Sequence, residues 1–347
     1  MLHFSEYVSI GHPDKIADYI SEYLLDRYIE RDIHTKYAVE VQIKDAYVTL
    51  GGEVSSKAYF PDDLIESFVR KAVNEIGYTK EYQDKWGKEN TICGDDLIVI
   101  NHIGQQSTEI AQGVVNNNGW GDQGIFYGYA EPNPEYDYMP IDHSIAKRIC
   151  KGLFESNIGG LDIKTQVVMD NFDIKEIIAA IPLLNGSKVD DVEKFIRNIV
   201  PGDYSIVING TGSYKQHSSI ADCGTTGRKL AVDFYGGNCK IGGGSPWTKD
   251  GSKADLTLNL LARKIAKNVC KETGEKVETS IACCIGKPEI IVTSKLLDGK
   301  GTIYNEKEVD YYPLKLIAEF ELHKPIYTSM CRWGLFGEFQ NDKKWEK

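Results

Sequence analysis

Apolar and polar residues follow one another along the chain in a pattern that predicts the same succession of elements three times. Each round has a helix with apolar residues three or four positions apart, then two strands that can form a hairpin, then a second helix. The expected first helices lie at 13–30, 142–156 and 253–270. The expected hairpins lie at 37–54, 164–184 and 277–294. The expected second helices lie at 61–77, 188–200 and 313–322. Short strands at 97–100 and 204–208 follow the second helix of the first two rounds.

The three hairpins begin near residues 37, 164 and 277, which gives a repeat of about 110 to 130 residues. This period is too long for a solenoid and favours an α+β fold of three similar domains, each with an antiparallel or mixed sheet and helices on one face. We expect an N-terminal domain at 1–108, a central domain at 109–219 and a C-terminal domain at 220–347. Since the open sheet faces need a cover, the pattern also predicts packed domains and a homo-oligomer.

Composition excludes several classes of partner. The 347-residue chain has 51 acidic and 40 basic residues and a formal net charge of −11, which argues against nucleic acid or an anionic membrane as its main partner. The first residues lack the pattern of a secretion signal and no run of 18 apolar residues occurs, so we expect a cytoplasmic protein that does not enter a membrane. The eight cysteines form no CxxC pair, which favours reduced thiols over disulfides or a zinc site.

A glycine-rich stretch, KIGGGSPWTKDGSKADLTLNLL at 240–261, is the strongest candidate for an anion site in this acidic chain. It does not match a Walker A loop, but its glycines allow backbone N–H groups to approach an anion closely, and the helix expected to follow adds a favourable dipole. Lys249 and Lys253 can neutralise phosphate groups, although solvated lysines are the simpler alternative. Basic residues upstream, Arg228 and Lys229, also lie beside glycines, so the pattern indicates a polyphosphate ligand.

The aspartates of this stretch have two alternative roles. Asp250 and Asp255 can hold Mg²⁺ against phosphate oxygens. Asp255 can instead form a capping box with Ser252 at the start of the helix. The residues themselves leave both roles open.

The motif GHPDK at 11–15 begins the first expected helix, with its proline at a favourable first position. His12 can protonate or hydrogen-bond a leaving oxygen there, and Asp14 can bind a metal, while a cap or surface role is the simpler alternative for the histidine. On the strands, Glu53 can bind an ammonium group and Glu40 a cation, or both can face water. Together these residues indicate a Mg²⁺-dependent enzyme that acts on a nucleoside triphosphate.

Seven motifs occur in an order that resembles the S-adenosylmethionine synthetase family, also called methionine adenosyltransferases. They are GHPDK, GGEV, IGQQS, GDQG, DCGTTGRK, DFYGG and GGGSPWTKDGSKAD, and the resemblance extends from Ser5 to about Trp345. It implies three α+β domains with pseudo-threefold symmetry and a reaction in which the sulfur of L-methionine attacks C5′ of ATP. The released triphosphate is then hydrolysed to phosphate and pyrophosphate. The resemblance also implies two Mg²⁺ ions per site, activation by K⁺, and active sites between the subunits of a dimer or a dimer of dimers.

Matching motif positions carry the implied roles of individual residues. The implied catalytic residues are His12, Lys164, Arg228, Lys229, Lys249 and Lys253. The implied methionine contacts are Glu53, Gln106, Asp222, Ile285 and Lys253. The implied ATP contacts are His12, Asp122, Asp162, Lys164, Tyr214, Asp222, Arg228, Lys229, Lys249 and Lys253. The implied metal ligands are Asp14 and Asp255 for Mg²⁺ and Glu40 for K⁺.

The segment NGTGSYKQHSSIADCG at 209–224 departs from the family pattern, which is commonly NPTGRF followed by a GGP-type turn. Ser213 stands where an arginine is usual, Tyr214 is the aromatic residue expected beside adenine, and residues 217–219 replace the glycine-type turn. These differences concern adenine binding and the triphosphatase step. They keep two alternatives open: a divergent member that acts mainly as a triphosphatase or on a methionine analogue, and a non-catalytic ATP-binding regulatory homologue.

Overall fold

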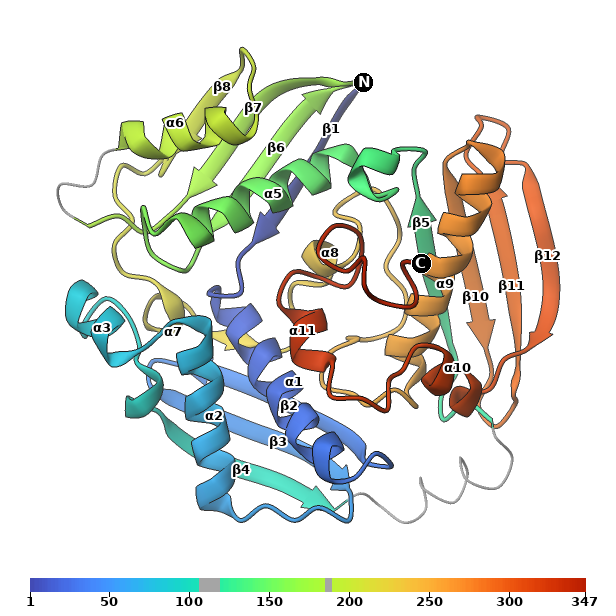
Figure 1. Cartoon of the computed structure of the whole chain (residues 1–347), viewed down its shortest axis with the longest axis horizontal. Helices are drawn as coiled ribbons and strands as arrows, with labels where there is room; N and C mark the ends of the chain where they lie inside the picture. Colours follow the sequence, from blue (N-terminus) through green and yellow to red (C-terminus); the bar gives the residue numbers. More distant parts are fainter. Residues whose placement is uncertain (106–118, 185–188) are drawn as a thin grey trace.

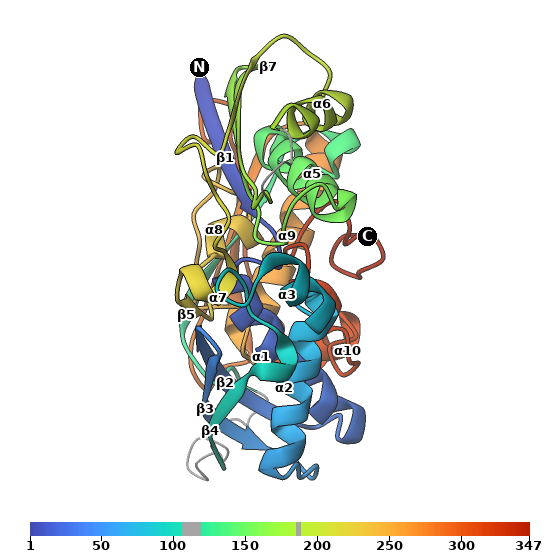
Figure 2. The same ribbon diagram turned by 90° about the vertical axis from the view of Figure 1, so that its left-hand side faces the viewer.

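Three four-stranded sheets surround the centre of the molecule in the computed structural model, which describes residues 1–105, 119–184 and 189–347 (Figure 1). Most of the helices lie on one side of the sheets, and the strands lie on the other (Figure 2). Within each sheet, alternate apolar side chains are buried against the helices, as expected for a sheet covered on one face. The structure therefore confirms the α+β fold class.

The first sheet has the strand order β4–β3–β2–β9. β2 and β3 form the expected antiparallel hairpin, and β4 runs parallel to β3. The elements of this part are α1 (Pro13–Arg31), β2 (Lys36–Lys44), β3 (Tyr47–Ser55), α2 (Asp62–Ile76), α3 (Lys80–Trp86), a 3₁₀ turn (Gly94–Asp96), β4 (Ile98–Gln105) and β9 (Gly224–Thr225).

The other two sheets repeat the hairpin plan, with strand orders β1–β6–β7–β8 and β12–β11–β10–β5. The second sheet and its helices comprise β1 (Leu2–Val8), α5 (Ile141–Ser156), β6 (Lys164–Asp170), β7 (Asp173–Ala180), α6 (Val189–Ile199) and β8 (Ser205–Ile208). The third comprises β5 (Gly124–Ala130), α9 (Ala254–Thr273), β10 (Val277–Cys283), β11 (Glu289–Leu296), β12 (Ile303–Asp310) and α10 (Pro313–Glu319). Shorter pieces are a 3₁₀ turn (Pro134–Tyr136), α7 (Ser218–Ala221), α8 (Leu230–Asp233) and α11 (Tyr327–Cys331). In the part of the chain that the structure describes, no helix is long and apolar enough to cross a membrane.

Each sheet takes one strand from a distant part of the sequence. β1 pairs with β6 of the second sheet, β5 pairs with β10 of the third, and β9 pairs with β2 of the first. Strand pairing thus does not follow the expected domain ranges 1–108, 109–219 and 220–347, which stay a prediction. Because β1, β5 and β9 each pair in a sheet from a distant part of the sequence, the residues that flank these strands connect one sheet to the next.

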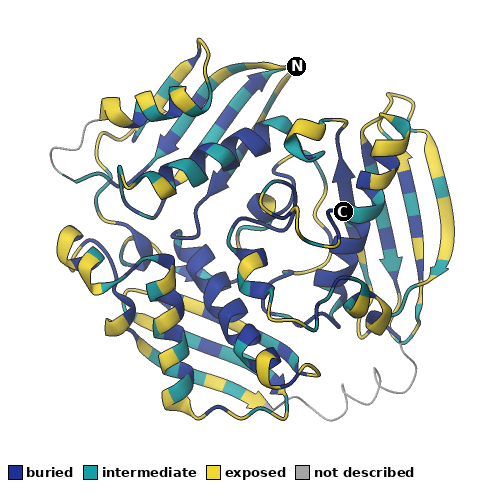
Figure 3. Cartoon of the chain, in the orientation of Figure 1, coloured by how far each residue is buried: buried dark blue, intermediate teal, exposed yellow. Residues whose placement is uncertain are grey.

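Helix α1 is buried on nearly all sides, although its pattern predicts an amphipathic helix. Only Arg27, Glu30 and Arg31 of its 19 residues are not buried (Figure 3). Its first half contacts β9 and its second half contacts α11, in addition to the packing against β2 and α2. The helix therefore carries its polar side chains into the interior, where they need partners.

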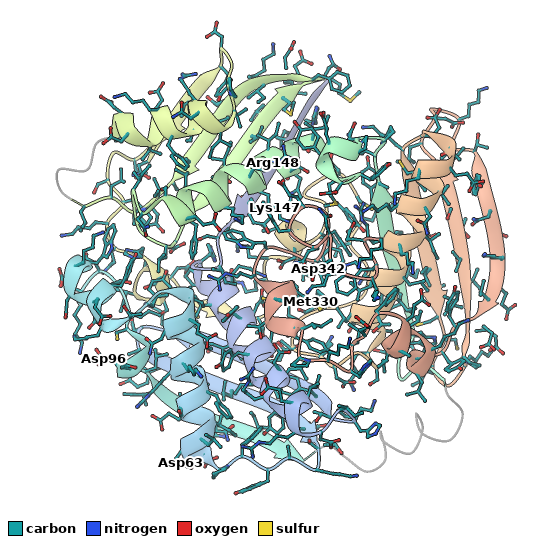
Figure 4. All side chains as sticks on the ribbon, in the orientation of Figure 1. Asp63, Asp96, Lys147, Arg148, Met330 and Asp342 are labelled. Atoms are coloured by element: carbon teal, nitrogen blue, oxygen red, sulfur yellow. The ribbon has the colours of Figure 1, made fainter. Side chains whose placement is uncertain are left out.

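The C-terminal segment lies near the centre of the view and links α5 and α9 (Figures 1 and 4). Lys147 of α5 donates to the carbonyl of Phe336 at 3.0 Å, and burial lowers the pKa of Lys147 to about 8. The fully buried Arg263 of α9 pairs with Glu346, with Nε 3.0 Å from Oε1. These contacts join the second and third sheets through the end of the chain.

Candidate active site

His12 and Asp14 lie at the N-terminus of α1, as the GHPDK motif predicts. His12 is the N-cap residue, and its Nδ1 accepts a hydrogen bond from the backbone N–H of Asp14 at 3.2 Å. Because Nδ1 is the acceptor, the neutral ring carries its proton on Nε2. Burial, assisted by the charge of Lys229, lowers the pKa of His12 to about 4, so the ring is neutral at pH 7. The capping role thus leaves Nε2–H for another partner.

Asp14 brings the 225–229 segment to the helix start. Its Oδ1 accepts from the backbone N–H of Thr225 at 2.9 Å, and its Oδ2 lies 2.6 Å from Lys229 Nζ. Arg228 Nε is 3.8 Å from Oδ1. Burial by itself would raise the pKa of Asp14, but the hydrogen bonds from Lys229 and Thr225 outweigh it and lower the pKa. An ionised carboxylate and two cations therefore share this place.

Asp162 adds a second carboxylate close by. It is buried, and its Oδ2 accepts from the backbone N–H of Ser218 at 3.0 Å. Burial raises the pKa of Asp162 to about 6, while Tyr214 and the Ser218 amide oppose the increase. The charge of Asp222 also raises this pKa, and the charge of Lys229 lowers it.

Lys164, the first residue of β6, is the third lysine or arginine of this region. It is half-exposed and pairs with Glu6 at 2.7 Å. Its charge contributes to the lowered pKa of His12. We refer to the residues gathered here as the helix-start cluster: His12, Asp14, Asp162, Lys164, Tyr214, Asp222, Arg228 and Lys229.

The glycine-rich loop surrounds a carboxylate. Asp255 accepts from the backbone N–H of Gly244 at 2.8 Å and forms an ion pair with Lys249. Gly243 has φ of +73°, and a Cβ there would come within 2.8 Å of Asp255 Oδ1, so glycine is required for this approach. The loop does bring a backbone N–H to an anion, as expected, and in the chain alone that anion is Asp255.

Asp255 is not part of a capping box with Ser252, so that alternative is wrong. The N-cap residue of α9 is Lys253, and it makes no side-chain capping hydrogen bond. The carboxylate of Asp250 already accepts two backbone hydrogen bonds, from the N–H of Tyr37 at 2.8 Å and from that of Ser252 at 2.9 Å. Asp250 therefore has a structural role, and Asp255 stays the candidate metal ligand of this loop.

A cavity of about 220 Å³ opens beside the loop. Asp122 lines it together with Lys249, Lys253 and Asp255, so the structure brings these four predicted residues to one place. The complete lining is Ala38, Gly121, Asp122, Lys249, Ser252, Lys253, Ala254 and Asp255. We refer to Asp122, Lys249, Lys253 and Asp255 as the lysine-loop cluster.

Glu40 lies between the two clusters. Its carboxylate accepts hydrogen bonds from the hydroxyl of Thr226 and, at 3.1 Å, from that of Thr248. Thr226 follows the residue that donates to Asp14, and Thr248 precedes Lys249. One strand carboxylate thus contacts both loops.

The remaining predicted residues lie near the cavity or beyond the described chain. Glu53 pairs across the β2–β3 hairpin with Ala38, which lines the cavity. Ile285 is 57% exposed and forms a bridge with Trp120. Gln106 lies outside the described residues. Among the side chains that are described, no ion pair joins the helix-start cluster to the lysine-loop cluster.

Comparisons with known proteins identify the family of the chain. Residues 1–108 match the model for the S-adenosylmethionine synthetase N-terminal domain, and residues 217–347 match the model for its C-terminal domain. An S-adenosylmethionine synthase of Clostridium tetani is 33% identical over 99% of this chain and 95% of its own, and one of Helicobacter hepaticus is 34% identical over 99% and 94%.

The chain belongs to the S-adenosylmethionine synthetase family. An unusual S-adenosylmethionine synthetase from Campylobacter jejuni superposes with a TM-score of 0.88 at 29% identity, and the match covers 100% of this chain and 96% of that one. Membership of this family makes the chain a methionine adenosyltransferase, an ATP-binding transferase of S-adenosylmethionine biosynthesis.

A row of buried carboxylates along α1 of this synthetase was not predicted from the sequence. Asp18, Glu22 and Asp26 follow Asp14 at intervals of four residues, and all are buried. Asp18 accepts from the N–H of Gly227 at 2.8 Å, Glu22 from that of Thr248, and Asp26 from that of Tyr327. The first two carboxylates thereby hold the loops that carry Arg228, Lys229 and Lys249. The four-residue spacing on a helix is the signal that could have revealed them.

Proposed function

We propose that this synthetase forms S-adenosylmethionine by attack of methionine sulfur on C5′ of ATP, with release of the triphosphate and its hydrolysis to phosphate and pyrophosphate. The observation that carries the proposal is the helix-start cluster, which combines a neutral histidine with an ionised aspartate and two adjacent cations. Such a group suits an oxygen that becomes negatively charged as it leaves carbon.

His12 contributes a hydrogen bond in this proposal. Its Nε2–H is directed away from the Asp14 amide and can donate to the oxygen that leaves C5′. Because the pKa of His12 is lowered to about 4, the imidazolium is scarce at pH 7, and proton donation by a charged ring does not contribute. Sulfur has no proton to lose, so the first step requires no general base.

The cations neutralise the triphosphate. Arg228, Lys229 and Lys164 act from the helix-start cluster, and Lys249 and Lys253 act from the lysine-loop cluster. Each fixed charge of this kind contributes about 2 to 4 kcal/mol to a transition state that gains negative charge. Asp122, Asp162 and Tyr214 are assigned to the nucleoside side, in line with the position of Tyr214 beside the buried Asp162.

Methionine is assigned to residues on the open sheet faces and the loops beside them. Glu53 suits its ammonium group, because a carboxylate on a strand beside the cavity is a direct partner for a cation. The exposed Ile285 suits its apolar side chain. Asp222, Gln106 and Lys253 complete the assigned contacts.

The carboxylates fit the implied metal ions. Among the described residues, no group of three or more histidine, cysteine, aspartate or glutamate side chains could form an all-protein metal site. Mg²⁺ in enzymes that bind polyphosphates is commonly held by one or two carboxylates plus phosphate oxygens, and Asp14 and Asp255 suit that arrangement. Glu40, with two threonine hydroxyls beside it, offers the hard oxygen donors that K⁺ prefers. Bound Mg²⁺ would stabilise the charge of the leaving triphosphate.

A second copy of the chain is part of the proposal. The helix-free sheet faces expose several apolar side chains, including Phe4, Tyr47, Ile98, Ile100 and Ile125. Exposed apolar side chains on a sheet face favour association with another surface. Pairing of these faces in a dimer, or in a dimer of dimers, would bring the helix-start cluster of one subunit to the lysine-loop cluster of its partner. A cytoplasmic location is consistent with such an enzyme.

One assay tests the reaction. The protein is incubated with ATP, L-methionine, Mg²⁺ and K⁺, and S-adenosylmethionine, phosphate and pyrophosphate are measured. We expect all three products in equal amounts. Phosphate release that does not depend on methionine would favour the triphosphatase alternative. Nucleotide binding without any product would favour the regulatory homologue.

The interface is tested separately. Ile98→Lys together with Ile100→Lys places two charges on the helix-free face of β4 and should produce monomers in sedimentation velocity, with loss of S-adenosylmethionine formation. The control variant is Leu314→Lys, which changes an exposed residue of α10 and should leave the assembly intact. Dimers that persist in the double variant would contradict the assignment of this face.

A further inference from the structure

His217 is buried in a cage of aromatic rings, although it lies in the segment that departs from the family pattern. Its side chain has no exposed surface. The centroid of its ring lies 4.8 Å from that of Trp86, 5.7 Å from Tyr82 and 6.3 Å from Tyr78. Tyr82 and Trp86 belong to α3, so the histidine attaches its segment to the N-terminal part of the chain.

Hydrogen bonds determine where the protons of this group lie. His217 Nδ1 is 2.7 Å from the carbonyl oxygen of Lys215, and Nε2 is 2.7 Å from the Tyr82 hydroxyl. Since a carbonyl only accepts, Nδ1 carries the proton and Nε2 accepts from Tyr82. The Tyr82 oxygen in turn accepts from the backbone N–H of Leu161 at 3.0 Å. Burial lowers the pKa of His217 to about 4, which agrees with a neutral ring that has one proton.

This series of hydrogen bonds, from His217 through Tyr82 to Leu161, ends at the helix-start cluster. Leu161 precedes Asp162, and the Asp162 carboxylate accepts from the N–H of Ser218, the residue after His217. The hydrogen bonds therefore close a ring from His217 through Tyr82 and Leu161 to Asp162 and back to the backbone of Ser218. Ser218 has φ of +60°, which is unfavourable for a serine and is maintained by its surroundings.

The same segment is tied to the chain at further points. The backbone N–H of His217 donates to the backbone carbonyl of Asn90 at 2.8 Å, and the Gln216 side chain donates to the carbonyl of Glu89 at 2.9 Å. The Tyr78 hydroxyl donates to the carbonyl of Gly11, which directly precedes His12, at 2.6 Å. The aromatic cage thus contacts both the 209–224 segment, which differs from the family pattern, and the start of α1.

We propose that His217 is a positioning residue that fixes Asp162 and Tyr214 for the nucleotide, by attaching the 214–218 segment to α3 through the hydroxyl of Tyr82. The proposal rests on the proposed function, which assigns those two residues to ATP. In this chain, the buried His217 fixes the conformation of the segment that commonly contains a glycine-type turn in the family. Removal of the imidazole would leave the Tyr82 hydroxyl without its acceptor and open space inside the cage.

Binding measurements on the full-length protein separate this role from a merely structural one. Dissociation constants for Mg²⁺ with an ATP analogue that has an imido link between its β and γ phosphates, and separately for L-methionine, are measured by calorimetry. The variants are His217→Ala, Tyr82→Phe and His217→Gln, whose amide oxygen can reach the place of Nε2 and accept from Tyr82. His143→Ala is the matched control, because His143 is an equally buried histidine that bonds a hydroxyl, that of Ser5, at 3.0 Å outside the site.

We expect His217→Ala and Tyr82→Phe to weaken binding of the analogue by about tenfold or more and binding of methionine by less than about twofold. His217→Gln should remain within about threefold of the parent protein, and His143→Ala should bind the analogue normally. If His217→Ala does not fold, Tyr82→Phe, which keeps the ring, decides the question.

Unchanged analogue binding in the folded variants would overturn the inference, and so would an equal loss in His143→Ala or an equal loss of methionine binding. The proposed function fails in a different way. A parent protein that binds the analogue but forms no S-adenosylmethionine would refute the proposed reaction and leave the role of His217 in nucleotide binding intact.

Discussion

Replacement of Lys249 by methionine tests the lysine-loop cluster most directly. Lys249 pairs with Asp255, and the two side chains are 21% and 20% exposed. Lys264 on α9 provides a matched control, because it pairs with Glu319 at 2.9 Å with similar exposures of 27% and 32%, but outside the cavity lining. Both substitutions remove one partly exposed ion pair and keep an unbranched side chain.

The expected magnitudes differ between stability and activity. A partly exposed ion pair contributes about 1 kcal/mol or less, so either variant should lower the melting temperature by about 2 to 4 °C at most. A cation that stabilises a leaving triphosphate contributes about 2 to 4 kcal/mol to the transition state, which corresponds to a loss of about 30- to 900-fold in kcat. Only Lys249→Met should show this second loss.

The assay compares initial rates of S-adenosylmethionine formation at saturating ATP and methionine, with melting curves of the same samples. Lys264→Met should keep at least about half of the parent rate. The reasoning is refuted if Lys249→Met keeps most of the parent rate, or if both variants lose activity equally. A lost cooperative melt in Lys249→Met would show that this residue is required for the fold.

Three further predictions follow from the buried carboxylates. Asp14→Asn keeps the shape of the side chain but removes the charge beside Lys229, so the rate should fall by about 30-fold or more with a cooperative melt retained, as measured by product formation and calorimetry. Burial holds the pKa of Glu22 well above its usual value, so Glu22→Gln should change the free energy of unfolding at pH 7 by less than about 1 kcal/mol in denaturant titrations, whereas Glu22→Ala, which frees the Thr248 amide, should cost about 2 to 3 kcal/mol. Burial raises the pKa of Asp162 from 3.8 to about 6. The stability that its protonated form contributes is therefore present below about pH 4 and is lost as the pH rises through 6, and Asp162→Asn should become more stable relative to the parent by up to about 3 kcal/mol between pH 4 and 7. A difference that does not change with pH would contradict the shifted pKa.

Local patterns predicted most of the elements. The hairpins at 37–54, 164–184 and 277–294 and the helices that begin at Pro13, Asp62 and Ala254 lie within a few residues of their expected positions, because each depends on periodicity and caps within a short window. β1 and β5 were not predicted, since their pairing partners lie more than one hundred residues away. β12 was not predicted because it is an exposed edge strand with no buried alternation.

The sequence by itself determined the family and supplied the chemical groups of the candidate site. The order and spacing of the motifs identified the family, and the types of residue at His12, Asp14 and Lys249 predicted an anion-binding site. Both inferences rest on properties of the chain that need no long-range contact. The tertiary structure decided how these groups are held. Asp255 became the partner of Lys249 instead of a helix cap, and Glu22 became the acceptor for the Thr248 amide. In the same way, His217 became the link between α3 and Asp162. Each of these outcomes depends on which distant segment buries the polar group and satisfies its hydrogen bonds, and that information exists only in the packed molecule.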